Sequence, residues 1–206
     1  LLSDGKVLLA GGSTSDGADG STELYDPRTG RAELGPNLSS GRARHTATAL
    51  LDGRVLLLGG FDGSSPIATA EIFDPTTGLV SATSSMNVER ASHTATLLSD
   101  GRVLVVGNGS AELFDPVSES FSPLGVSPFV NHAAVLTPDG RVLLVGANIA
   151  DEAVAQVFDP SSETFAATGA PTTFTPGSHS LTLLRNGRVL VYGGCPCFSV
   201  GGPIFS

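Results

Sequence analysis

An all-β fold of repeated four-stranded antiparallel units is predicted for this 206-residue chain by three observations. A phrase of the form Asp/Asn-Gly-Lys/Arg-Val-Leu occurs five times, starting at residues 4, 52, 100, 139 and 186. A second phrase that ends in Asp-Pro occurs four times between these copies. No segment shows helical periodicity, and 26 glycines and 13 prolines separate the apolar runs. A spacing of 39 to 48 residues between the copies indicates stacked supersecondary units.

Each repeat is predicted to start with a hairpin of two strands, which we call A and B. In four copies a histidine stands seven residues before the Asp or Asn, and a glycine stands seven residues after it. Asp-Gly and Asn-Gly are strong hairpin signals, so we expect a two-residue turn between the strands. Strand A is rich in small residues (46–49), as expected for a strand that lines a crowded centre. Strand B is a continuous apolar run (55–58), which indicates burial on both faces.

Strands C and D follow in each repeat. The end of strand C lies in the phrases 23–27, 71–75, 112–116 and 156–160, each of which closes with Asp-Pro. Proline presets φ and aspartate bonds its own backbone, so a tight turn should lead into a short strand D. Four antiparallel strands per repeat predict a β-propeller in which each repeat is one blade. The predicted blades span residues 1–41 (without the first strand), 42–89, 90–128, 129–175 and 176–206 (incomplete).

These four and a half blades are expected to form a single partial propeller domain. An unclosed propeller would leave long apolar edges open to aggregation. We therefore expect the segment to belong to a larger propeller of about six or seven blades, and the remaining blades are then its first partners.

The repeats resemble kelch repeats, whose blades carry Gly-Gly at the end of strand B and Glu-x-Tyr/Phe-Asp in strand C. Gly11-Gly12, Gly59-Gly60 and Gly193-Gly194 match this pattern, whereas Asn108 and Ala147 replace the second glycine. The tryptophan usual in strand D is absent, which implies lighter outer packing. The variant with His-Thr-Ala-Thr resembles bacterial members of the galactose-oxidase-like propeller superfamily. That resemblance implies a secreted or cell-envelope location in a bacterium.

Composition excludes some partners. Eight of the acidic residues behind the net charge of −9 belong to Asp-Gly or Asp-Pro turns, so the acidity is largely structural. The 11 basic residues are scattered, which argues against a nucleic-acid groove. No apolar stretch approaches the roughly 18 residues of a membrane span, so we expect no membrane insertion. For Cys195 and Cys197 a strained disulfide or half a metal site remains open, and free thiols are the expected state.

A candidate binding surface follows from the order of the strands. The A–B and C–D turns share one rim and are uniformly short, whereas the B–C and D–A connections share the opposite rim and vary in length. Recognition on rigid scaffolds is usually carried by such variable loops. The alternative is that the polar side chains only solvate the rim. The candidate residues are Asp16, Arg42, Arg44, His45, Asp62, Arg90, His93, Asn108, Asn131, His132, Asp151 and His179.

No metal or other cofactor is expected. The four histidines occupy equivalent positions in successive blades, which should be roughly 10 Å apart. Zinc needs its ligands at about 2 Å, so we expect the histidines to have a structural role and to bond loop backbone. The loop 16–20 has two aspartates but lacks the full set of calcium ligands and the closing glutamate.

Two ion pairs are predicted inside the blades. Glu71 and Glu112 lie in strand C, where a lone carboxylate would be costly to bury. In the same two blades Arg42 and Arg90 stand three residues before the strand A histidine. The fourth blade has Phe129 and Gln156 at these two places, so both charges are absent together. We expect Arg42 to pair with Glu71 and Arg90 with Glu112, for stability.

The sequence favours a non-catalytic recognition or scaffold module that binds a protein, or a glycan, through the variable rim. Protein is preferred over glycan, because sugar stacking would need clustered aromatic residues on the rim, and apart from Phe61 the sequence shows no such cluster there. The first alternative is the propeller portion of a galactose-oxidase-like copper oxidase or another carbohydrate-active enzyme. Tyr25 and Tyr192 do not match such a copper site, so its catalytic residues would lie outside this segment. The second alternative is a rigid spacer.

Overall fold

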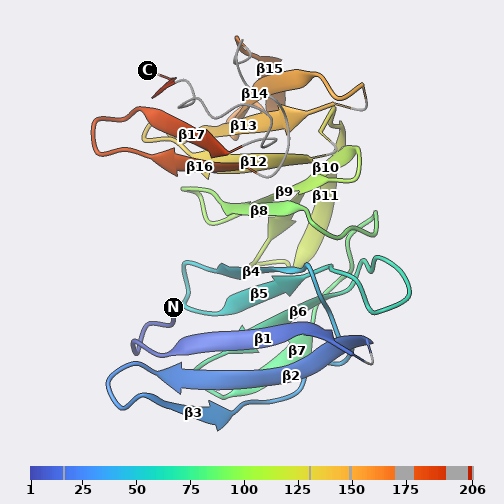
Figure 1. Cartoon of the computed structure of the whole chain (residues 1–206), viewed down its shortest axis with the longest axis vertical. Helices are drawn as coiled ribbons and strands as arrows, with labels where there is room; N and C mark the ends of the chain where they lie inside the picture. The colour runs from blue at the N-terminus through green and yellow to red at the C-terminus, as the bar shows by residue number, and fades with distance from the viewer. Residues whose placement is uncertain (16, 130, 149, 170–178, 194–203, 206) are drawn as a thin grey trace.

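The computed structural model describes residues 1–15, 17–129, 131–148, 150–169, 179–193 and 204–205. All regular structure in this part of the chain is β, arranged in five antiparallel sheets (Figure 1). The all-β prediction is therefore confirmed. None of the described residues forms a helix that could cross a membrane.

Each sheet is formed by strands that are consecutive in the chain, and we call the sheets blades one to five. Blade one contains β1 (Val7–Thr14), β2 (Gly17–Asp26) and β3 (Arg31–Leu34), and blade two contains β4 (Thr46–Ala49), β5 (Val55–Leu58), β6 (Ala70–Asp74) and β7 (Leu79–Ala82). Blade three contains β8 (Thr94–Leu97), β9 (Val103–Gly107), β10 (Ser110–Asp115) and β11 (Ser120–Val126). Blade four contains β12 (Asn131–Leu136), β13 (Val142–Ala147), β14 (Ala153–Asp159) and β15 (Thr164–Ala167), and blade five contains β16 (His179–Leu183), β17 (Val189–Gly193) and β18 (Ile204–Phe205).

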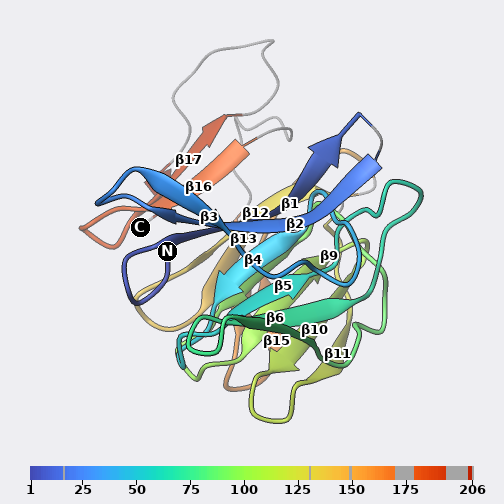
Figure 2. The same cartoon turned by 90° about the horizontal axis from the view of Figure 1, so that it is seen from below.

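The blades follow one another in chain order, from β1–β3 at the bottom of Figure 1 to blades four and five at the top. Their first strands β4, β8, β12 and β16 contact each other in that order. In the view from below, the outer strands β11 and β15 lie on the side away from β16 and β17 (Figure 2). The described blades form an open series with strand A inside and strand D outside, as in neighbouring propeller blades.

The hydrophobic cores lie between blades. In β5 the side chains alternate, so that Leu57 packs with Phe73 toward blade one. Leu56 and Leu58 pack with Phe114 toward blade three. All these side chains are fully buried, as expected for strand B. Burying each leucine contributes about 1.5–3 kcal/mol, so the contact between blades is itself a main source of stability.

The expected two-residue A–B turn is wrong. The backbone N–H of Leu50 donates to the carbonyl of Arg54 at 2.8 Å, and Gly53 donates back to Leu50 at 3.1 Å. Three residues therefore stand between the paired residues, and of these only Gly53 has a positive φ, of 89°. A two-residue type I′ turn, the type that Asp-Gly favours, would need two positive φ values. Asp52 instead accepts the Arg54 N–H at 3.0 Å, which favours the longer turn.

The B–C connection of blade one is a hairpin rather than a long loop. Strands β1 and β2 stay paired up to Thr14 and Gly17, with a register shift between Ala10 and Gly12. Gly12 has a φ of 139°, a conformation that other residues rarely adopt. The glycine irregularity lets pairing resume beyond the blade, so this hairpin extends toward the variable rim.

Candidate functional site

Three connections meet on the variable rim between blades one and two. They are the β1–β2 hairpin, the segment before β4 and the β5–β6 loop. Phe61 pairs with both Ala43 and Pro66 through isolated bridges, which hold the β5–β6 loop against the neighbouring segment. The three connections enclose a hollow of about 320 Å³. Its lining residues are Ser13, Thr14, Gly17, Ala18, Ala43, Arg44, Phe61 and Gly63.

Arg44 supplies the exposed charge of this hollow. Within the described residues its guanidinium forms no hydrogen bond or ion pair. Its backbone has a φ of 54°, and its carbonyl accepts the Ser92 N–H at 3.0 Å. Ser92 occupies the equivalent position of blade three with the same φ of 54°. The backbone conformation is therefore a property of the repeat, whereas the free cation is a property of blade two.

The other exposed candidates shape their own loops. Asp62 accepts N–H bonds from Ser65 and Ser64, which hold the pKa of its carboxyl below the ordinary value. The Asn108 side-chain amide donates to the Glu89 carbonyl at 3.1 Å. Asn131 begins β12 and Asp151 lies in the β13–β14 connection, and both are exposed. Asp16, Cys195 and Cys197 lie outside the described residues.

Arg42 and Arg90 do not belong to the binding surface. Both side chains are 0% exposed, because each turns from the rim into its own blade. Their place in the candidate rim is therefore corrected. Arg42 forms an ion pair with Glu71, and Arg90 forms one with Glu112.

Backbone groups add further hydrogen bonds to both ion pairs. Arg42 donates to the carbonyls of Gly59 and Thr69 at 3.0 and 3.1 Å. Glu71 accepts the Ser39 N–H at 2.8 Å. In blade three, Glu112 similarly accepts the Asn87 N–H at 2.8 Å. Each pair therefore also ties the incoming D–A loop to strand C, which makes it a structural feature of the blade.

Blade four replaces this charged network with an apolar side chain. Phe129 is 0% exposed, and its ring centroid lies 5.1 Å from that of His132. Gln156 has a buried side-chain oxygen that accepts no hydrogen bond among the described residues. The fourth blade therefore shows that this fold accepts Phe and Gln in place of the Arg–Glu pair.

The strand A histidines connect consecutive blades. His93 Nε2 lies 2.9 Å from Thr46 Oγ1, and His132 Nε2 lies 2.8 Å from Thr94 Oγ1. His179 instead lies 2.8 Å from the carbonyl of Val145, which is the β-sheet partner of Ala133. Ala133 occupies the place of the threonine and has no hydroxyl, so the histidine bonds the adjacent strand. The Nε2 atoms of these rings therefore contact the inner strands, which the sequence did not predict. The expected loop contact is present in part, because the Arg42 and Arg90 carbonyls of the D–A loops act to raise the pKa of His45 and His93.

Burial keeps two of these rings neutral. Desolvation lowers the pKa of His93 to about 4, with smaller effects from the charge of Arg90 and from the neighbouring histidines. Desolvation likewise lowers the pKa of His132 to about 4. His45 is partly buried, and its pKa is also lowered, first by desolvation and then by Arg42. Within the described ranges, no cluster of three or more His, Cys, Asp or Glu side chains could hold a metal.

Lowering the pH from 7 to 5 should therefore destabilise the protein. The unfolded chain binds protons on its histidines below pH 6.5, whereas folded His93 and His132 stay neutral until about pH 4. The stability present above pH 6.5 is thus lost as the pH falls, by about 2 kcal/mol per histidine at pH 5. Urea unfolding at both pH values measures the loss. A His132→Asn variant should lose less than the wild type, and an equal loss would contradict the assignment.

A double glycine joins neighbouring blades on the same rim. The Gly60 N–H donates to the Arg90 carbonyl at 2.9 Å, and a Cβ at Gly59 would lie 2.6 Å from that carbonyl oxygen. Gly12 donates to the Arg42 carbonyl in the same way. A family model described as Kelch motif matches residues 42–87, which cover most of blade two. Blade two is a kelch repeat, and the other blades repeat its antiparallel sheet.

The kelch match agrees with the repeated four-stranded sheets of the fold. Kelch repeats build β-propeller modules, and such modules commonly mediate protein interactions. A search of curated proteins finds no match to this chain. The Gly-Gly and Glu-x-Phe-Asp positions, which carried the resemblance in the sequence, are the positions that connect and brace the blades.

Proposed function

We propose that this kelch propeller segment is a non-catalytic recognition module that binds a protein partner through the variable rim of blades one and two. The supporting observation is the convergence of three connections on one hollow. Binding modules generally present such loops on a rigid scaffold, and the ion pairs and interblade cores supply the rigidity here.

The chemistry of the hollow suits a protein segment. Phe61 and Ala18 offer apolar contact, while Arg44 offers a cation that no described carboxylate neutralises. A guanidinium binds carboxylates with two parallel hydrogen bonds. A partner segment with an acidic side chain or a terminal carboxylate beside an apolar residue fits both features.

Capture from the lysate and medium of the organism that encodes the chain tests this proposal. The wild-type chain is compared with a double variant, Arg44→Ser and Asp62→Asn. Serine stands at the equivalent of Arg44 in blade three, and asparagine keeps an oxygen acceptor in the turn of Asp62. We expect at least one partner whose affinity falls about tenfold or more in the variant.

The control is Arg28→Ser, which removes an exposed arginine from the opposite rim. This variant should retain the partner with unchanged affinity, and both variants should keep the wild-type melting temperature. Failure to capture a partner, or a partner held equally well by the double variant, would contradict the proposal.

A further inference from the structure

A row of hollows lies on the opposite rim, where the short turns of neighbouring blades meet. Each hollow lies between the A–B turn of one blade and the A–B and C–D turns of the next. Between blades two and three the hollow measures about 520 Å³, and between blades three and four about 650 Å³. The two hollows occupy equivalent places in consecutive blades, so their linings can be compared residue by residue.

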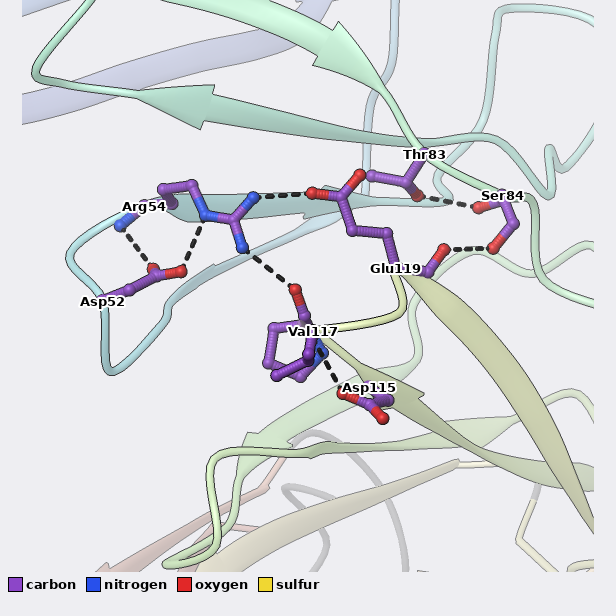
Figure 3. A network of polar contacts seen from close by, with 8 residues as sticks. Asp52, Arg54, Thr83, Ser84, Asp115, Val117 and Glu119 are labelled. Carbon is purple, nitrogen blue, oxygen red and sulfur yellow. Dashed lines mark hydrogen bonds and ion pairs between the residues drawn. The ribbon is translucent and has the colours of Figure 1, made fainter.

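An arginine crosses each of these junctions. Arg54 pairs with Asp52 in its own turn at 2.7 Å and reaches Glu119 of the next blade at 2.6 Å. It also donates to the Pro116 carbonyl at 3.0 Å. Figure 3 shows the Arg54 guanidinium between Asp52 and Glu119, with Val117 close by. At the next junction Arg102 makes the same contacts with Asp100, Glu163 and the Pro160 carbonyl.

The glutamates of these contacts occupy a position that favours glycine. Glu119 and Glu163 have φ values of 51° and 55°, whereas the equivalent residues of blades one and two are Gly30 and Gly78, both at 69°. A side chain at such a φ costs stability. The arginine contact offsets this cost. The turn of blade one carries Lys6 in place of the arginine, and the C–D turn of the next blade correspondingly carries Gly78 in place of the glutamate. The arginine is therefore already satisfied by the protein and is not free to bind a ligand.

Apolar side chains distinguish the junction between blades two and three. Leu51 stands before the Asp-Gly of its turn, and Val117 follows Asp-Pro; they are 69% and 92% exposed. Both line the hollow, together with Pro116. Ser99 and Ser161 hold the equivalent positions at the next junction, where the lining is polar. Ser3 and Thr76 hold them at the preceding junction.

The charge around the apolar residues is negative. The hollow is lined by three carboxylates, Asp52, Asp100 and Glu119, and by a single cation, Arg54. Arg54 is engaged by two of these carboxylates, and Asp100 is paired with Arg102 from the side of the next junction. The Asp52 and Asp100 side chains remain 48% and 43% exposed. An approaching group therefore meets an apolar floor with acidic edges.

We infer that the hollow around Leu51 and Val117 is a second interaction surface, which takes an apolar side chain flanked by a lysine or arginine of a partner protein. The apolar side chain covers Leu51, Val117 and Pro116, and the basic residue pairs with Asp52 or Asp100. Burying exposed leucine and valine supplies the hydrophobic gain. The acidic edge selects the basic neighbour. This surface is separate from the variable rim, and its test does not depend on the proposed function.

A random twelve-residue peptide library displayed on phage is the probe. The library is selected on the wild-type chain after depletion on a Leu51→Ser, Val117→Ser variant, which reproduces the side chains of the next junction. Surviving peptides should share a large apolar residue next to a lysine or arginine. When synthesised, they should bind the variant at least tenfold more weakly than the wild type.

The matched control is a Leu79→Ser, Val126→Ser variant. These residues are 64% and 89% exposed, so the same two substitutions remove similar apolar surface elsewhere. The control should bind the selected peptides as the wild type does. Asp100→Asn should weaken binding severalfold and reduce its dependence on salt, because it removes one acidic charge from the edge of the hollow. The turn should keep its conformation, since Asn186 holds the equivalent turn in blade five.

Equal melting temperatures of all variants show that binding, rather than folding, has changed. The inference is overturned when no peptide survives depletion, when the survivors lack basic residues, or when the control variant loses binding as strongly as the junction variant.

Discussion

Replacing Arg90 with alanine should lower the free energy of unfolding by about 3–5 kcal/mol, because Glu112 would stay buried without its cation. The Glu112 side chain is only 2% exposed, and it would keep only the donors of Asn87 and Val88. The Ser110 carbonyl would lose the Arg90 donor as well. Urea unfolding at pH 7 measures the loss.

The fourth blade provides the control for this experiment. A double variant, Arg90→Phe and Glu112→Gln, reproduces the combination of Phe129 and Gln156. It should be more stable than Arg90→Ala, since it removes both charges and fills the space with a ring. An Arg90→Ala protein with wild-type stability would show that the ion pair does not support the blade.

Replacing Gly59 with alanine should cost about 2–4 kcal/mol, because two effects act at the same position. The φ of 57° is unfavourable for alanine by about 1 kcal/mol or more. The added Cβ would also lie 2.6 Å from the Arg90 carbonyl oxygen, so blades two and three would have to separate locally. That movement weakens the bond from Gly60 to the same carbonyl and the core packing beneath it.

Gly78→Ala separates the two effects. Gly78 has a similar φ of 69°, but nothing lies within 4 Å of its Cβ position. This variant should lose only about 1 kcal/mol, the cost of the backbone conformation. Thermal and urea unfolding of the two variants give the comparison. Equal losses would mean that the close contact between blades has no energetic role.

The arginine positions show how far sequence reasoning reached at the candidate site. The paired absence of charge at Phe129 and Gln156 predicted which carboxylates Arg42 and Arg90 would meet. The same residues also seemed suited to the rim, because their place in the chain is next to a variable loop. Only the direction of the side chains excluded them, and Arg44 remained as the exposed cation of the hollow.

The chain by itself determined the repeated strands, the positions of the turns and the pairing of charges within a blade. These features depend on residues that are close in sequence or on differences between equivalent repeats, so a local pattern carries them. The tertiary structure alone decided how one blade meets the next. His93 reaches Thr46 across 47 residues, and Arg54 reaches Glu119 across 65. Such contacts depend on how neighbouring sheets pack, which no local periodicity encodes. The hollows on the two rims are formed by that packing.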